Sequence, residues 1–148
     1  MSETETIALK LRTTLRFLLR RAEDIRGPGS PARSEQSVLV WLDERGPMSP
    51  KALADAQKVR PQTVAQTLDS LARHKWTRRS PHPNDRRQIL ISLSPSGKKA
   101  LEKGRNLRQT WLVGELKKLT SQERKTLSAA LELLDRFIPH DFPTPSKS

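Results

Sequence analysis

The stretch from Arg60 to Lys75 constrains the fold of this 148-residue chain more than any other. Wound as a helix, it has apolar residues at the i, i+4, i+7, i+8 spacing of a buried face: Val64, Leu68, Leu71 and Ala72. The opposite face is polar and carries Gln62, Gln66, Asp69, Ser70 and Arg73, with Thr63 at its edge. Such a helix can pack on a small core and present to DNA the groups that read base edges. An amphipathic surface helix without that role is the alternative.

Capping signals divide the preceding residues into two shorter helices. Ser30-Pro31 predicts an N-cap followed by a proline in the first turn, and Gly46-Pro47 predicts the end of that helix. Ser49-Pro50 predicts the start of another helix that runs to about Gln57, and Pro61 starts the next one. Two short helices joined by a tight turn, the second with a polar outer face, have the layout of a helix-turn-helix.

A β-hairpin with a basic tip is predicted directly after these helices. Residues 76–80 are compatible with a strand, and residues 89–93 are a run rich in branched side chains. Two prolines and an Asn-Asp pair between them favour an exposed turn, which carries Arg86 and Arg87. An arginine at such a tip can enter the minor groove of A·T-rich DNA, and Asp85 would orient it through an ion pair. A merely solvated tip is the alternative, but the position after a helix-turn-helix predicts a winged helix.

Long amphipathic helices are predicted at both ends of the chain. Apolar residues step by three and four over residues 7–25, Ser94-Pro95 opens a long basic helix, and Thr120 to Glu123 has the pattern of a capping box. Their spare apolar surface favours burial against a second copy, and burial among the chain's own helices is the alternative. The predicted fold is therefore mostly α with a small β-hairpin wing. Its parts are an N-terminal dimerisation helix (1–29), a winged helix-turn-helix DNA-binding lobe (30–94), C-terminal dimerisation helices (95–138) and a disordered tail (139–148).

The charge of the chain indicates a polyanionic partner. Lysine and arginine number 28 against 16 acidic residues, for a formal net charge of +12. An excess of this size favours nucleic acid first and an anionic membrane surface second. No run approaches the roughly 20 apolar residues that span a bilayer, and the acidic start MSETET is unlike a signal peptide. We therefore expect a cytoplasmic protein that does not enter a membrane.

Enzymatic and metal-dependent functions are not expected. The chain has no cysteine, which excludes disulfides and thiolate zinc sites. The histidines, His74, His82 and His140, have no ligand spacing and are interpreted as exposed side chains. No nucleophile with an adjacent base and no glycine-rich phosphate loop can be assembled. The expected protein uses no cofactor and no metal.

Three segments resemble the MarR family of bacterial transcription regulators. They are GPMSPKALAD (46–55), VRPQTVAQTLDSL (59–71) and NDRRQILISLSPSGKKAL (84–101), and the last contains the family's Asp-x-Arg wing motif. The resemblance implies a homodimer that binds a pseudo-palindromic operator in double-stranded DNA, most often as a repressor. It also implies base reading by Gln62, Thr63 and Gln66, backbone contacts by Ser49, Lys51, Arg60 and Thr67, and a minor-groove place for Arg87. With the remaining basic and wing positions, the predicted DNA-binding set is Ser49, Lys51, Arg60, Gln62, Thr63, Gln66, Thr67, Arg73, Asp85, Arg86 and Arg87.

Some positions depart from the family pattern or extend it. Gln57 and Lys58 stand where an apolar residue and glycine are usual, and a left-handed lysine costs on the order of 1 kcal/mol, so a different turn is expected. Gln66 stands where arginine is common, which favours adenine over guanine. Trp41 and Trp111 are candidates to line a pocket for a small aromatic or lipophilic effector between the two lobes, with core packing as the alternative.

Two other function classes are consistent with these features. One is an architectural DNA-binding protein that is indifferent to sequence and is held by charge alone. The other is a protein-interaction module whose winged helix no longer binds DNA. Competition binding at raised salt separates the first from a regulator, and substitution of the wing arginines tests the second.

Overall fold

The computed structural model describes residues 1–140, which form six helices and one β-hairpin. In chain order the elements are α1 (Glu3–Glu23), α2 (Arg33–Arg45), α3 (Pro50–Gln57), α4 (Pro61–Arg73), β1 (Thr77–Pro81), β2 (Ile89–Leu93), α5 (Pro95–Lys117) and α6 (Ser121–Asp135). This confirms the predicted fold class of a mostly helical chain with a hairpin wing. Residues 141–148 of the predicted tail lie outside the described residues. Within residues 1–140, no helix combines the length and the apolar character that crossing a membrane would require.

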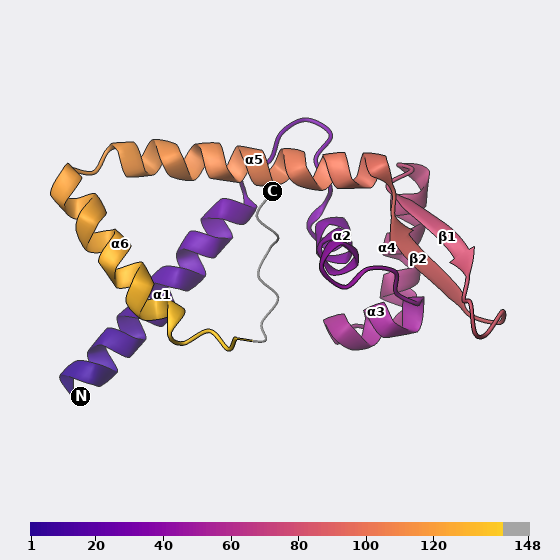
Figure 1. The fold of residues 1–148 in the computed structure, drawn as a ribbon, viewed down its shortest axis with the longest axis horizontal. Helices are drawn as coiled ribbons and strands as arrows, with labels where there is room; N and C mark the ends of the chain where they lie inside the picture. Colours follow the sequence, from indigo (N-terminus) through magenta and orange to yellow (C-terminus); the bar gives the residue numbers. More distant parts are fainter. Residues whose placement is uncertain (141–148) are drawn as a thin grey trace.

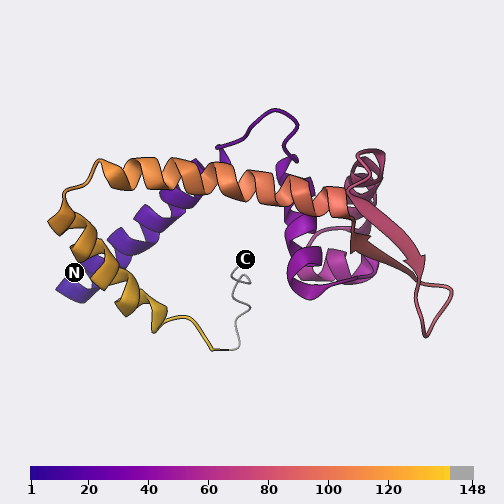
Figure 2. The same ribbon diagram turned by 45° about the horizontal axis from the view of Figure 1, so that its top comes forward.

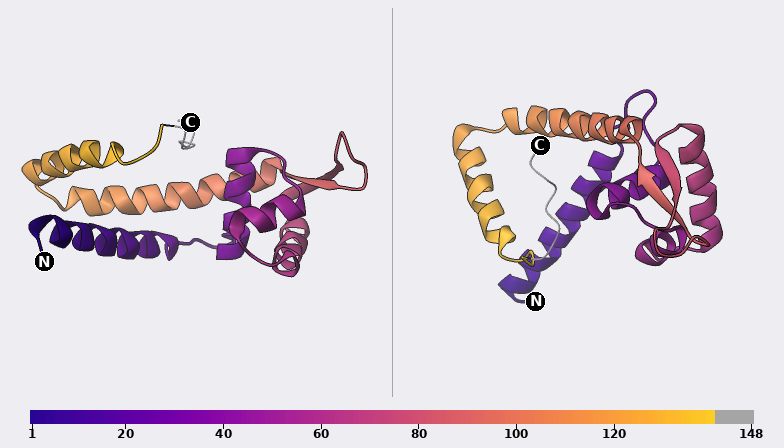
Figure 3. Two further views of the ribbon diagram at one scale, coloured as in Figure 1. Left: turned by 90° about the horizontal axis from the view of Figure 1, so that it is seen from below. Right: turned by 45° about the vertical axis from the view of Figure 1, so that its right-hand side comes forward.

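α5 runs along most of the molecule and connects two groups of elements (Figure 1). α2, α3, α4 and the hairpin gather at its N-terminal end, and the hairpin projects away from the helices (Figure 2). α1 and α6 lie at the other end. They cross in Figure 1, but the view from below shows them on opposite sides of α5 (Figure 3). The chain therefore has a compact lobe and an open end of two separated helices.

The hydrophobic core lies entirely in the lobe and where α5 joins it. Its buried side chains come from α2, α3, α4, β2 and α5: Val38, Leu39, Leu42, Leu53, Ala54, Val64, Leu68, Leu71, Ile91 and Leu101. In α4 the prediction that Ala72 is buried is wrong, because Ala72 is exposed and Thr67 is buried instead. At about 100° per residue, Thr67 lies about 60° from the direction of Val64 and Ala72 about 80° on the other side.

The start of α2 differs from the sequence prediction. The N-cap is Ala32, whose N–H donates to the Glu35 carboxylate at 2.9 Å, whereas Ser30 was expected to cap this helix. The Ser30 hydroxyl instead accepts from the N–H of Gly27 at 3.0 Å and closes the turn before the helix. A carboxylate is the stronger acceptor for a helix N-terminus because it is charged.

The other helix starts agree with their capping signals. Ser49 accepts from the N–H of Ala52 at 3.1 Å, Ser94 caps α5, and Thr120 forms a capping box with Glu123. The turn after α3 does not follow the prediction. Lys58 adopts the left-handed conformation (φ 55°, ψ 42°), and the turn is closed by a bond from the N–H of Val59 to the carbonyl of Ala54 at 3.1 Å. This closure satisfies a helix-end carbonyl and offsets the strain of a left-handed lysine.

Backbone contacts fix the wing and α5 against the helices. β1 and β2 are antiparallel with Arg79 opposite Ile91, and Ile91 also pairs with Met48 through bonds of 2.8 and 3.0 Å. A Cβ added to Gly97 would lie 2.0 Å from the carbonyl oxygen of Trp76. The first turn of α5 therefore packs directly on the backbone between α4 and β1, which only glycine permits.

Candidate nucleic-acid interface

The outward face of α4 is formed by its first two turns. Pro61 occupies the first helical position, where its fixed φ and missing N–H are compatible with a helix start. Gln62, Thr63 and Gln66 follow, and all three side chains are exposed. Arg60 is the N-cap residue, and its exposed side chain makes no capping bond. The amides, the hydroxyl and the guanidinium are therefore available to an external partner.

Two polar residues of α4 do not face outward. Thr67 is only 9% exposed, and its hydroxyl donates to the carbonyl of Thr63 at 3.1 Å. Thr67 therefore offers a phosphate little exposed surface, and its predicted backbone contact stays a prediction. Ser70 donates to the Glu35 carboxylate at 3.0 Å, so it faces α2 and not the polar side on which the sequence placed it.

The last turns of α4 are connected to the wing by an ion pair that no local sequence pattern predicts. Arg79 of β1 lies 3.4 Å from the Asp69 carboxylate, and both side chains are at least half exposed. Arg73 is exposed at the end of the helix, as predicted. The sequence shows two adjacent arginines near the start of the strand, Arg78 and Arg79. Only the tertiary structure shows that Arg79 lies next to a carboxylate.

The start of α3 supplies the predicted backbone-contacting residues. Lys51 is exposed. Ser49 is half-buried, and its hydroxyl is occupied by the cap of α3. A phosphate at this position would therefore meet the helix N-terminal amides and the Lys51 charge more readily than the Ser49 hydroxyl.

The wing tip is a loop with its own hydrogen bonds. The N–H of His82 donates to the carbonyl of Gln88, and the N–H of Gln88 donates to the carbonyl of Asp85, both at 3.0 Å. The Asp85 carboxylate accepts from the N–H of Arg87 at 3.1 Å, while the Arg87 guanidinium is 3.9 Å away and 96% exposed. Asp85 thus forms the predicted ion pair with a neighbouring arginine, Arg87, at 3.9 Å, and it also shapes the loop through the backbone. Arg86 is exposed as well.

A carboxylate between α2 and α5 connects the lobe to the long helix. Asp43 lies 2.8 Å from Lys98 and 2.9 Å from Arg105. Burial by itself would raise the pKa of Asp43, but the hydrogen bonds and charges of Lys98 and Arg105 outweigh it and hold the pKa below its ordinary value. A few residues further along α5, burial and the neighbouring cations Arg105 and Arg26 lower the pKa of Arg108.

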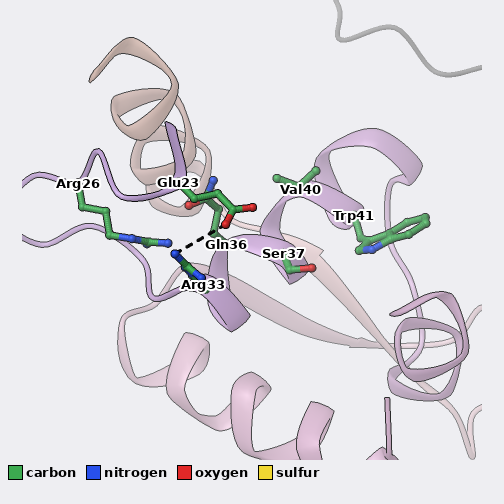
Figure 4. Close-up of a pocket in the computed structure, with 7 residues that line it drawn as sticks. All are labelled: Glu23, Arg26, Arg33, Gln36, Ser37, Val40 and Trp41. Carbon is green, nitrogen blue, oxygen red and sulfur yellow. Dashed lines mark ion pairs between the residues drawn. The ribbon is translucent and has the colours of Figure 1, made fainter. Parts of the chain in front are cut away.

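A pocket of about 260 Å³ lies where the end of α1 meets α2. Figure 4 shows its lining: Glu23, Arg26, Arg33, Gln36, Ser37, Val40 and Trp41. Arg33 pairs with Asp24 at 2.8 Å and with Glu23 at 3.8 Å. Trp111 is not part of the lining; the guanidinium of Arg21 lies 5.8 Å from its ring centre. Of the two tryptophans predicted to line an effector pocket, Trp41 is therefore the one that lines this pocket.

The helix-turn-helix, its exposed polar face and the basic hairpin together define a winged helix-turn-helix protein. Comparison with known proteins agrees. The family model described as MarR family matches residues 33–89. An HTH-type transcriptional regulator of Mycobacterium bovis is 37% identical over 134 residues, which cover 90% of this chain and 88% of that protein. The chain belongs to the MarR family of helix-turn-helix transcriptional regulators. Its members are regulators, which confirms the prediction that this chain is not an enzyme.

Solved structures show the same fold. A transcriptional regulator from Thermotoga maritima superposes with a TM-score of 0.80 at 18% identity, over 95% of this chain and 99% of that one. A mutant of Staphylococcus aureus MepR bound to an oligodeoxyribonucleotide superposes with a TM-score of 0.68 at 19% identity, over 89% of this chain and 98% of that one.

Proposed function

We propose that this protein is a homodimeric repressor that acts in the cytoplasm, binds a pseudo-palindromic operator and is released by a small-molecule effector. The observation that carries the proposal is the uncovered start of α4, with Gln62 and Gln66 exposed, beside a wing whose Arg87 is 96% exposed. Glutamine amides pair with adenine in the major groove, and an extended arginine suits the minor groove. The net charge of +12 adds affinity for phosphate.

The open end of the molecule supports the dimer. No residue of α1 or α6 is buried, and Leu18 is 50% exposed and Leu131 53% exposed. Removing apolar surface from water lowers the free energy by about 25 cal/mol per Å². A second copy supplies an identical face and brings a second α4 to the DNA. Sedimentation at working concentrations tests this, and a monomer would contradict the proposal.

Footprinting on the DNA upstream of the protein's own gene tests operator binding. We expect protection of a paired site with two half-sites about one helical turn apart. Competition with bulk DNA at raised salt separates this function from charge-driven architectural binding, because phosphate contacts weaken steeply with salt while base contacts persist. Loss of the preference for the protected site at raised salt would favour the architectural function. If an Arg86→Ala, Arg87→Ala double variant retains DNA as well as the wild type does, the wing does not contribute to DNA binding. That result would favour a protein-interaction module.

The pocket between α1 and α2 supports an effector with an aromatic ring and a negative charge. Trp41 offers an apolar face, and the lining holds two cations, Arg26 and Arg33, of which Arg33 pairs with the carboxylate of Glu23 at 3.8 Å. An effector alters DNA affinity only if it binds one arrangement of the lobe and α1 better than another. Benzoate and neutral benzyl alcohol are suitable probes. We expect benzoate to release the operator at lower concentration, and Trp41→Ala to remove the response.

A further inference from the structure

The end of the recognition helix α4 is held against the start of α2 by a buried carboxylate. The Glu35 side chain is 9% exposed, and one of its oxygens caps α2 through the N–H of Ala32. The other oxygen accepts from the hydroxyl of Ser70 at 3.0 Å and lies 3.6 Å from Nε2 of His74. Ser70 and His74 are one turn apart at the end of α4, so both face the same carboxylate oxygen.

The His74 ring is held in place by the residues that follow it. Lys75 adopts a left-handed conformation (φ 61°), which turns the chain back on itself. Trp76 then stacks on His74, with ring centres 4.1 Å apart and planes 16° from parallel. The N–H of Trp76 donates to the carbonyl of Leu71 at 3.1 Å, and its side chain packs against the core. The imidazole is therefore fixed next to Glu35, while half of it remains open to solvent.

Other charged groups lie next to this joint. Arg73 precedes His74 in sequence and Lys75 follows it, while Asp69 of α4 is paired with Arg79 of β1. Among residues 1–140 no ion pair connects this joint to α3 or α5. The α5 cations Lys98 and Arg105 both pair with Asp43 instead. Glu35 of α2 is thus the charged partner that His74 faces. A protonated histidine is also favoured at a helix C-terminus by the helix dipole.

We propose that Glu35 and His74 form a pH-dependent ion pair that positions the end of α4 against α2. Operator affinity then falls as pH rises. This rests on the proposed function of α4 in DNA binding. Histidine changes charge between about pH 5 and 8. A protonated His74 attracts the carboxylate oxygen and adds to the contacts that hold the end of α4 against α2. A neutral His74 leaves the Ser70 bond and the core packing of Leu71 to do so. Neither residue touches DNA in this account.

The test measures operator affinity of the full-length protein by fluorescence anisotropy from pH 5.5 to 8.5. For the wild type we expect affinity to fall on the order of two- to five-fold with rising pH, the range that a partly exposed ion pair supports. His74→Gln and Glu35→Gln should bind as the wild type does at pH 8.5 across the whole range. The double variant should lose no more than either single variant.

His82 provides the matched control because it is a histidine in the wing loop, close to the proposed DNA surface. His82→Gln should keep the pH dependence that Glu35 and His74 produce. It would lower the slope of log affinity against log salt at acid pH if His82 contacts phosphate, whereas His74→Gln should leave that slope unchanged. A pH profile of His74→Gln that superposes on that of the wild type, or a reduced salt slope in this variant, overturns the proposal.

A readout without DNA separates failure of the pair from failure of the proposed function. Because His74 stacks on Trp76, the emission of Trp76 in a Trp41→Phe, Trp111→Phe background should change with the charge of His74. An emission change that Glu35→Gln alters, together with pH-independent operator affinity, shows that the pair does not position α4. Absence of any preferred DNA site at every pH rejects the proposed function and the positioning role with it. His74→Gln changes a half-exposed residue, so the test does not depend on the folding of Glu35→Gln.

Discussion

Replacing Asp43 by asparagine tests how the lobe is attached to α5. Hydrogen bonds to charged groups contribute about 1.5–3 kcal/mol each, and exposed ion pairs about 0.2–1 kcal/mol. The Asp43 side chain is 13% exposed, while Lys98 and Arg105 are 47% and 36% exposed, so an intermediate value applies. Asparagine keeps one oxygen acceptor and loses the charge. We expect Asp43→Asn to lower the free energy of unfolding by about 1–2 kcal/mol.

The assay is urea unfolding at equal protein concentration, followed by circular dichroism. Glu44→Gln is the matched control because Glu44 is the next residue on α2, is exposed and forms no ion pair within the described residues. That variant should stay within about 0.5 kcal/mol of the wild type. Equal midpoints for the two variants at pH 6 would refute the account of Asp43.

Acid gives an independent check of the same contact. The pKa of Asp43 is lowered in the folded protein, so the stability it contributes is present above the unfolded pKa of about 3.9 and is lost as pH falls through the lower folded value. The difference between the wild type and Asp43→Asn should be full at pH 6 and shrink below about pH 4. A difference that does not shrink in acid would show that charge is not its source.

Three further substitutions test packing, capping and DNA contacts. Gly97→Ala should lower the free energy of unfolding, measured by thermal unfolding, by about 1–3 kcal/mol because its Cβ would lie 2.0 Å from the Trp76 carbonyl oxygen. Gly114→Ala is the control and should cost nothing, since a Cβ there meets no atom within 4 Å. Equal effects of the two substitutions would contradict the close packing at Gly97. Ser49→Ala removes the cap of α3 and should lower the urea midpoint by an amount equivalent to about 1 kcal/mol, and an unchanged midpoint would contradict that role. Arg87→Ala should reduce the slope of log affinity against log salt by about 1, whereas Gln66→Ala should leave the slope and weaken the preference for one base pair by about 1–3 kcal/mol. Anisotropy titrations at several salt concentrations would reveal the reverse pattern if the two roles are exchanged.

Features that depend on local chemistry were predicted well from the sequence. The caps at Ser49, Ser94 and Thr120 each involve a side chain and a backbone N–H three residues away, so the sequence contains both partners. The strand at Ile89–Leu93 and the proline at the start of α4 are equally local. The family motif of the wing also lies within a few residues.

Features that depend on competition between partners, or on tertiary contacts, were not predicted. Two candidates could cap α2, and the carboxylate of Glu35 replaces the expected hydroxyl of Ser30. Thr67 is buried because the core lies slightly to one side of the apolar face that the spacing of residues predicts. Such spacing determines the edge of a buried helix face only to within about one residue. The pairing of Arg79 with Asp69 joins a strand to a helix, so no local pattern contains it.

The length of α5 also determines the angle between the two ends of the molecule. It has 23 residues and so is about 35 Å long at 1.5 Å per residue. Deleting one residue from its middle would shorten it only slightly, but it would rotate α6 by about 100° around the axis of α5 relative to the wing. Two symmetric copies would then direct their wings away from a common duplex. For the proposed dimer we therefore expect changes in the length of this helix to be tolerated only in steps close to whole turns, and a seven-residue insertion should preserve the relative orientation far better than a two-residue insertion.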